Sequence, residues 1–169
     1  YGYSSRKYRE GDFIETAEGL IFDVKGIAHP IDRVIAFVRY VPDPKGDRQR
    51  HNQRYRKIYK LTQRQHYLQQ QYPHCLRYDS IFDLTISQVP HTAIHQHYRP
   101  QRKAYELMSE KAADPFERHT VAFITKIIQI AQISQSVLGV SGSLLVNLHS
   151  SNSDIDLIVY GKAAAHSVR

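Results

Sequence analysis

Residues with the potential for catalysis lie near the C-terminal end of the chain. Gly142 and Ser143 are followed, after ten further residues, by the triplet Asp154-Ile155-Asp156. Carboxylates two positions apart on a strand project from the same face, where they repel each other unless a cation lies between them. Oxygen ligands of this kind suit Mg2+ or Mn2+. A Gly-Ser turn before a helix offers free backbone N–H groups that can hold a phosphate. Together these features predict phosphoryl or nucleotidyl transfer.

Secondary structure that could position these residues is expected on both sides of the turn. Residues 137–140 form a short apolar pattern typical of a strand, and residues 144–148 are expected to form one or two helical turns. A polar loop over 149–153 then leads into a second strand over 154–160, which opens on the two acids. On that strand Ile155, Leu157 and Val159 would face a core. The simpler alternative is a polar turn that only caps a strand, because Ser, Asn and Asp are common turn residues.

This arrangement resembles the nucleotidyltransferase superfamily typified by DNA polymerase β, whose signature is Gly-Ser, about ten residues, then Asp-x-Asp on a strand. The resemblance covers residues 114–169. It implies that Asp154 and Asp156 are catalytic and hold two divalent metal ions, Mg2+ or Mn2+. It also implies that Gly142 and Ser143 bind the phosphates of an NTP. Proximity in sequence alone suggests that Ser151, Asn152 and Ser153 help to orient the triphosphate, and Ser153 is taken as a further nucleotide-binding residue. The expected reaction is transfer of a nucleoside monophosphate to an acceptor.

One part of the family pattern is missing from the sequence. The family normally supplies a third carboxylate from a later strand, but no Asp or Glu follows Asp156. The chain also starts at Tyr1 without Met, and it stops in a stretch that is expected to begin a helix. We therefore expect a truncated nucleotidyltransferase domain in a piece of a longer protein, with the third acid supplied from elsewhere or absent. These 169 residues alone should bind NTP–Mg2+ weakly and turn over poorly.

The positive charge of the chain is concentrated in one stretch. Residues 48–78 contain eight Arg and Lys and no acid, whereas the whole chain has a formal net charge of +7. Tyrosines alternate with these charges, so the stretch could neutralise phosphates and stack on bases. The alternative is a solvated basic face that contacts an acidic region elsewhere. The candidate nucleic-acid-binding residues are Arg48, Arg50, Arg54, Arg56, Lys57, Lys60 and Arg64.

The N-terminal two thirds of the chain has the pattern of antiparallel strands. A hairpin is expected over 12–26 with its turn at Glu18-Gly19, followed by a strand over 32–41 and a basic strand over 54–60. The sequence further predicts a helix over 62–71 capped by Thr62, a short strand around 82–86, irregular structure over 90–98, a helix over 101–111 and a helix that starts at Asp114. The predicted fold class is thus α+β, with a basic β-rich module over 1–111 and the start of a nucleotidyltransferase α/β domain over 112–169.

Composition limits the setting in which the protein works. No apolar run approaches the length of about 18 residues that a membrane helix needs, so we expect no membrane partner. A single cysteine, Cys75, excludes an internal disulfide and a cysteine-based zinc cage, which favours the cytoplasm. The spacing of His91, His95 and His97 could bind zinc only if this stretch were helical, and surface histidines are the simpler interpretation.

Three functions remain open from the sequence. The first is a nucleotidyltransferase acting on a nucleic acid, with RNA among the acceptors. The second is a minimal nucleotidyltransferase that modifies a protein, as in antitoxin-like relatives of the family, which have the same Gly-Ser-x10-Asp-x-Asp spacing. The third is a non-catalytic nucleic-acid-binding or regulatory protein with an incomplete site. Oligomeric state has no signal in the sequence.

Overall fold

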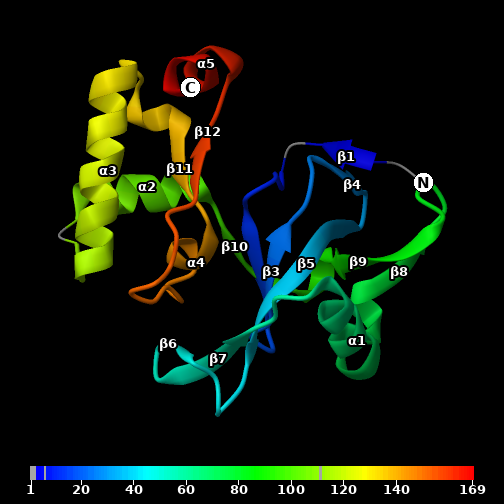
Figure 1. The fold of residues 1–169 in the computed structure, drawn as a ribbon. Helices are drawn as coiled ribbons and strands as arrows, with labels where there is room; N and C mark the ends of the chain where they lie inside the picture. The colour runs from blue at the N-terminus through cyan, green and yellow to red at the C-terminus, as the bar shows by residue number, and fades with distance from the viewer. Residues whose placement is uncertain (1–2, 6, 111) are drawn as a thin grey trace. The chain divides into compact units, whose positions relative to one another are not determined.

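The computed structural model describes residues 3–5, 7–110 and 112–169, and it divides the chain into two compact units, residues 1–97 and 98–169. The described strand pairs with a recorded register are antiparallel, and they occur together with five α-helices. The predicted α+β class is therefore confirmed (Figure 1).

The first unit is built on an eight-stranded sheet in which β10, β2, β3, β5, β7 and β6 follow one another, while β9 pairs with β5 and β8 with β9. A separate pair joins β1 to β4. The elements of the first unit are β1 (Tyr3–Ser5), β2 (Phe13–Thr16), β3 (Ile21–Val24), β4 (Ala28–Pro30), β5 (Arg33–Pro42), β6 (Arg48–Arg50), β7 (Gln53–Lys57), α1 (Leu61–Gln71), the 3-10 turn η1 (Pro73–Cys75), β8 (Leu76–Asp79), β9 (Leu84–Pro90), η2 (His91–Ala93) and β10 (Ile94–Tyr98).

Strand β5 organises this sheet because it pairs with three neighbours along its length. Its first residues pair with β9, its middle with β3 and its end with β7. The alternation of its side chains places Val34, Ala36 and Val38 at 0% exposure in the core. The β2–β3 hairpin turns at Gly19, whose φ of +85° is a conformation that a side chain disfavours. The predicted hairpin and long strand are confirmed.

Two local predictions in this unit are wrong. The position preceding α1 is Lys60, with no side-chain cap, so Thr62 lies inside the helix rather than at its start. The His-rich stretch expected to be irregular forms η2 and then β10, which pairs with β2. A tertiary contact explains the second difference, because His97 Nε2 lies 2.7 Å from a carboxylate oxygen of the buried Asp12.

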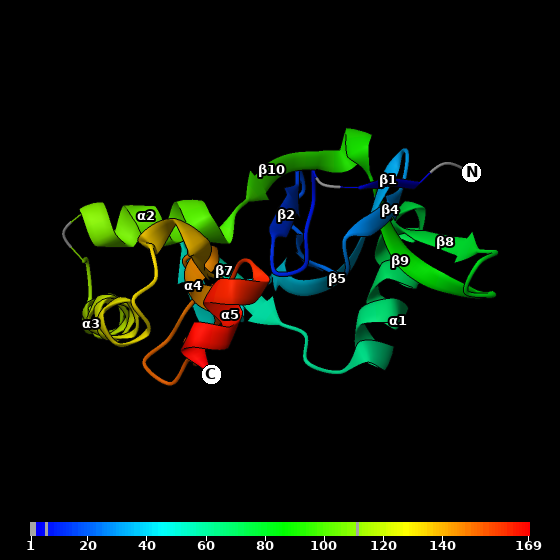
Figure 2. The same cartoon turned by 90° about the horizontal axis from the view of Figure 1, so that it is seen from above.

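The second unit consists of helices around a two-stranded antiparallel pair. Its elements are α2 (Pro100–Ser109), α3 (Pro115–Ala131), η3 (Gln135–Val137), β11 (Leu138–Val140), α4 (Gly142–Leu145), β12 (Leu157–Val159) and α5 (Lys162–Val168). Helix α3 is seen almost end-on in Figure 2, where it runs across the direction of α2. The core of the unit gathers Ala104, Leu107, Ile124, Leu138, Val140 and Leu144. The sequence predicts the start of an α/β domain here. Among the described residues, the strands of this unit form only the antiparallel pair of β11 and β12.

The division between the units differs from the predicted boundary at 111–112. Helix α2 belongs to the second unit, since Ala104 and Leu107 are buried in the same core as Leu138. The start of α2 also lies close to β11, since a Cβ added to Gly139 would lie 2.6 Å from Cβ of Pro100. The sequence pattern assigns α2 to the first unit because Ala112-Ala113-Asp114, which follow this helix, look like a linker.

Within the described residues, no helix combines the length and the apolar character that spanning a membrane requires.

Candidate functional site

The site predicted from the sequence is assembled around Gly142. Strand β11 ends at Val140, and the amide of Ser141 donates to the main-chain oxygen of Asp156 at 2.8 Å. Gly142 then turns the chain at a φ of +66°. A Cβ built on Gly142 would lie 1.9 Å from Oδ2 of Asp156, so only glycine leaves room for that carboxylate. The turn and the second acid, which are distant in sequence, are therefore in direct contact.

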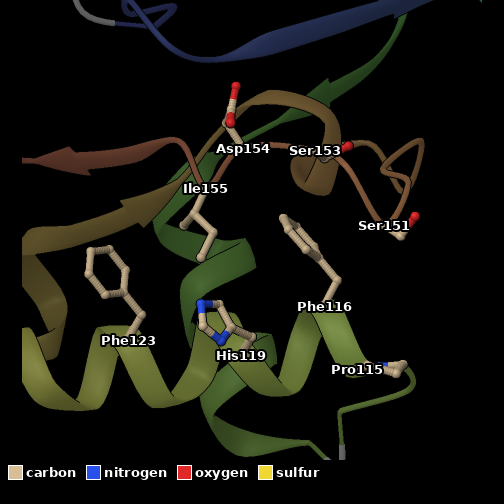
Figure 3. A pocket seen from close by; sticks show the side chains of 8 residues that line it. All are labelled: Pro115, Phe116, His119, Phe123, Ser151, Ser153, Asp154 and Ile155. Atoms are coloured by element: carbon tan, nitrogen blue, oxygen red, sulfur yellow. The ribbon is translucent and has the colours of Figure 1, made fainter.

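The two acids stand immediately before β12 rather than on it. Both side chains are exposed, and the described residues provide neither of them with a side-chain hydrogen bond or an ion pair. Figure 3 shows the carboxylate of Asp154 pointing away from α3, whereas Ile155 points toward that helix. Leu157 and Val159 pack against the core, so the predicted alternation is present. Two neighbouring carboxylates without a protein partner fit the oxygen ligand set of Mg2+ or Mn2+.

The two serines of the predicted site take different positions. Ser143 is 7% exposed at the start of α4, and its main-chain oxygen accepts from the amide of Leu148 at 2.9 Å. The hydroxyl of Ser153 accepts from the amide of Ser150 at 2.8 Å, which closes the polar loop on itself. The loop geometry therefore accounts for Ser153 without a ligand, as the simpler interpretation of this turn expects.

A hollow of about 710 Å3 lies between α3 and the loop that carries the acids. Phe116, His119 and Phe123 project into it from one face of α3, because their spacing of three and four residues matches the helical repeat (Figure 3). Ser151, Ser153, Asp154 and Ile155 form the opposite side, and Pro115 completes the lining. The apolar periodicity of α3 predicts only a packing role for these helix residues. The signal that could have revealed them is a histidine between two aromatic residues on one helix face.

A histidine and two acids meet at the start of α3. The carboxylate of Asp114 caps the helix by accepting from the Glu117 amide at 2.9 Å, and its other oxygen lies 2.6 Å from Nε2 of His149. The His149 ring stacks on Phe116 at 5.4 Å between ring centroids. Partial burial alone would raise the pKa of Asp114, but the Glu117 amide and His149 outweigh it and hold the pKa below its ordinary value. One ligand atom each from Asp114, Glu117 and His149 lies within 4.8 Å of the others, a geometry that could hold a cation.

The predicted basic set divides into interior and surface residues. Arg50 is buried, with Nη2 2.7 Å from Oε1 of Glu15, and Arg64 is buried with its guanidinium on the main-chain oxygens of Ile58 and Tyr59. Neither side chain can reach a nucleic acid from these positions. Their assignment to a nucleic-acid interface is corrected, because charge alone in a sequence does not distinguish a buried arginine from an exposed one.

The other basic residues remain at or near the surface. Arg54, Arg56 and Lys60 are exposed, although Arg56 pairs with Asp43 at 3.0 Å. Lys57 lies over the rings of Tyr40 and Tyr59, at 5.9 and 5.1 Å from their centroids. Arg48 is partly buried, 3.6 Å from Asp47. These five residues stay candidates for contact with a polyanion.

Comparison with known proteins finds an archaeal relative. No protein-family model matches the chain, and no solved structure matches it. The chain is 30% identical over 164 residues to the uncharacterized protein MJ1086 of Methanocaldococcus jannaschii, an alignment that covers 92% of this chain. It covers 48% of that protein, so the chain spans about half the length of the curated relative that it matches.

Proposed function

We propose that the protein transfers a nucleoside monophosphate from an NTP to a nucleic-acid acceptor, with Gly142, Asp154 and Asp156 at the centre of the site. The observation that carries this proposal is the contact between Gly142 and the Asp156 carboxylate. The first N–H groups of a helix lack intrahelical partners and can hold a phosphate, and this turn into α4 lies directly beside an acid that can bind the accompanying cation. The resemblance of Gly-Ser-x10-Asp-x-Asp to nucleotidyltransferases supports the same assignment.

In this proposal Asp154 and Asp156 hold Mg2+ or Mn2+. The metal would lower the pKa of the attacking hydroxyl and neutralise charge on the leaving pyrophosphate. The residues of the chain itself hold the phosphate and the metal-binding carboxylate in position. The close contact at Gly142 fixes one acid against the turn, so phosphate and carboxylate are held side by side without a side chain between them. Because no Asp or Glu follows Asp156, we expect weak NTP–Mg2+ binding and slow turnover by these 169 residues.

The charge distribution of the first unit supports a polyanionic acceptor. Arg54, Arg56 and Lys60 are exposed in a stretch without any acid, which is the footprint of phosphate binding. Tyr59, 64% exposed beside Lys57, offers a ring on which a base can stack. We also propose a cytoplasmic location, because the only cysteine is a free buried thiol.

The test is label transfer. The protein is incubated with labelled NTPs and Mg2+ together with RNA, DNA or protein acceptors, and NTP binding is measured in parallel. The double variant Asp154→Asn/Asp156→Asn keeps the shape of both side chains while removing their charge. It should lose metal-dependent NTP binding and any label transfer. Label on a protein acceptor alone would favour the antitoxin-like alternative.

A matched control removes the same charge elsewhere in the second unit. Glu106 and Glu110 lie at the end of α2, and Glu106 pairs with the exposed Arg102. The variant Glu106→Gln/Glu110→Gln should bind and transfer like the wild type. Transfer that survives the loss of Asp154 and Asp156 would refute the assignment. Nucleic-acid binding without any metal-dependent NTP binding would leave only the non-catalytic function.

A further inference from the structure

A second, smaller cavity lies in the first unit. Its volume is about 150 Å3, and its lining residues come from α1, the middle of β5 and the β8–β9 hairpin. Its walls are mainly apolar and include Leu61, Leu68, Leu76 and Ile86. Four polar residues, Arg64, Gln65, Thr85 and Ser87, also line it.

Arg64 carries a charge that the protein does not neutralise. The residue is 8% exposed, and it donates from Nε to the Ile58 oxygen and from Nη2 to the Tyr59 oxygen, both at 2.9 Å. These bonds join α1 to the residues that follow β7, but carbonyl oxygens do not neutralise a cation. No carboxylate of the described residues forms an ion pair with it. A buried charge without a counter-ion is costly, because charged groups are almost never buried unless they are paired.

The electrostatics around Arg64 add to this imbalance. Burial lowers the pKa of the Arg64 guanidinium, and the positive charge of Arg39 lowers it further, while Asp23 opposes them. Asp23 is already engaged by Lys25 at 2.8 Å and lies 4.0 Å from Arg39. The neighbourhood therefore has an excess of positive charge that a bound anion would offset.

Ser87 provides an independent sign of a missing partner. It lies on β9, is 8% exposed, and its hydroxyl is buried without a hydrogen-bond partner among the described residues. A buried hydroxyl without a partner has lost its hydrogen bonds to water and gained none in return, which is unfavourable. Buried polar groups in native structures are generally hydrogen-bonded to protein or to water, so the Ser87 hydroxyl has the capacity to bind a water molecule or a ligand group.

We propose that this cavity binds a small organic carboxylate, whose charge is held by Arg64 and Ser87 and whose apolar body lies among the leucines of α1 and the β8–β9 hairpin. The site is separate from the proposed nucleotidyl transfer and does not depend on it. Arginine suits this role because its planar fork matches a carboxylate. A cavity of this size admits a body about as large as benzene.

The experiment uses benzoate and 4-methylpentanoate as probes of the whole protein. Methyl NMR resonances of Leu68, Leu76 and Ile86 should shift saturably with either acid. Toluene tests the apolar body without the charge, and acetate tests the charge without the body. Both should bind at least about tenfold more weakly, since a hydrogen bond to a charged group is worth about 1.5–3 kcal/mol.

Variants separate the cavity from the surface charge. Arg64→Met keeps the length of the side chain and should weaken benzoate binding at least about tenfold, whereas Arg56→Met, on the exposed strand β7, should leave it unchanged. If Arg64→Met does not fold, Ser87→Ala leaves the arginine bonds intact and should still weaken binding.

Three outcomes would overturn the proposal. They are no saturable shift with either acid, toluene binding as tightly as benzoate, and benzoate binding that Ser87→Ala leaves unchanged.

Discussion

Gly142 is the residue at which backbone geometry and chemistry coincide. Its φ of +66° is one obstacle to any side chain, and the 1.9 Å separation between an added Cβ and Asp156 is another. The first obstacle is conformational, because left-handed backbone costs most residues about 1–2 kcal/mol. The second is steric and acts directly on a proposed metal ligand. The two effects can be distinguished by comparing glycines.

We expect Gly142→Ala to lower the free energy of unfolding by at least about 1–2 kcal/mol and to abolish metal-dependent NTP binding. Gly161→Ala is the control in the same unit, since Gly161 also has a positive φ, +94°, but nothing within 4 Å of an added Cβ. It should lose stability while keeping NTP binding. Urea denaturation and equilibrium NTP binding measure the two quantities. Equal loss of binding in both variants would contradict a specific role for the Gly142–Asp156 contact.

Cys75 is expected to be chemically inert. Its thiol is 1% exposed, and burial raises its pKa to about 11. Because the thiolate is the reactive form, alkylation near pH 8 should be slow in the folded protein and fast after denaturation. Mass spectrometry after timed exposure to iodoacetamide measures this. Rapid labelling of the folded protein would contradict the buried position.

Among the secondary-structure elements, two segments position the candidate surfaces. Helix α3 brings aromatic residues and His119 to the hollow beside the acids, and its start is tied to the His149 side chain through Asp114. Strand β7 and the residue before α1 carry three exposed cations of the first unit, Arg54, Arg56 and Lys60. Substitutions in these two segments should have effects that do not depend on catalysis at Asp154.

Asp114→Asn should make stability less dependent on pH. The folded-state pKa of Asp114 is depressed, so its charge stabilises the protein above the unfolded pKa of about 3.9, and this contribution is lost as the pH falls through the folded pKa. Asparagine still caps a helix, so the variant removes mainly the charge. At pH 7 we expect a loss of about 0.3–1 kcal/mol, from urea denaturation. That difference should shrink progressively as the pH falls below about 4. A difference that stays constant with pH would contradict the assignment.

Arg54→Gln/Arg56→Gln/Lys60→Gln should weaken binding to single-stranded RNA and make it less sensitive to salt. Removing one phosphate-binding cation should reduce the slope of log K against log salt by about 0.7. Fluorescence anisotropy over a salt series measures it. The variant Arg118→Gln/Lys126→Gln/Lys162→Gln removes the same number of charges from the second unit. An equal effect of both variants would show that net charge, rather than this surface, governs binding.

For the molecule as a whole, the division into units decides which fragments can fold. Helix α2 contributes Ala104 and Leu107 to the core of the second unit. Further side-chain bonds hold it there, since Lys103 Nζ donates to the Asn147 side chain at 2.7 Å and Gln101 to the Ser136 carbonyl at 2.9 Å. A fragment that begins after α2 therefore lacks one wall of its core.

We expect residues 98–169 to fold cooperatively and residues 112–169 to remain unfolded. Losing a single buried leucine such as Leu107 costs about 2–5 kcal/mol, which is a large part of the stability of a small unit. Circular dichroism and thermal unfolding of the two fragments compare them. Cooperative unfolding of the shorter fragment would restore the boundary at 111–112.

Local patterns in the amino-acid sequence are sufficient to predict several elements of the fold. The β2–β3 hairpin, the alternation along β5 and the capped helix at Asp114 follow from turn residues, side-chain period and capping, which act within a few positions. The spacing of Gly142, Asp154 and Asp156 likewise indicates a candidate site from the sequence alone.

Long-range packing, in contrast, settles which charges are buried and which elements share a core. Arg50 and Arg64 resemble their neighbours in sequence, yet one pairs with Glu15 and the other lines an apolar cavity. The direct contact of Gly142 with Asp156 and the place of α2 in the second unit also depend on tertiary structure. The physical reason is that burial and charge pairing are set by residues far apart in the chain, which local patterns do not encode.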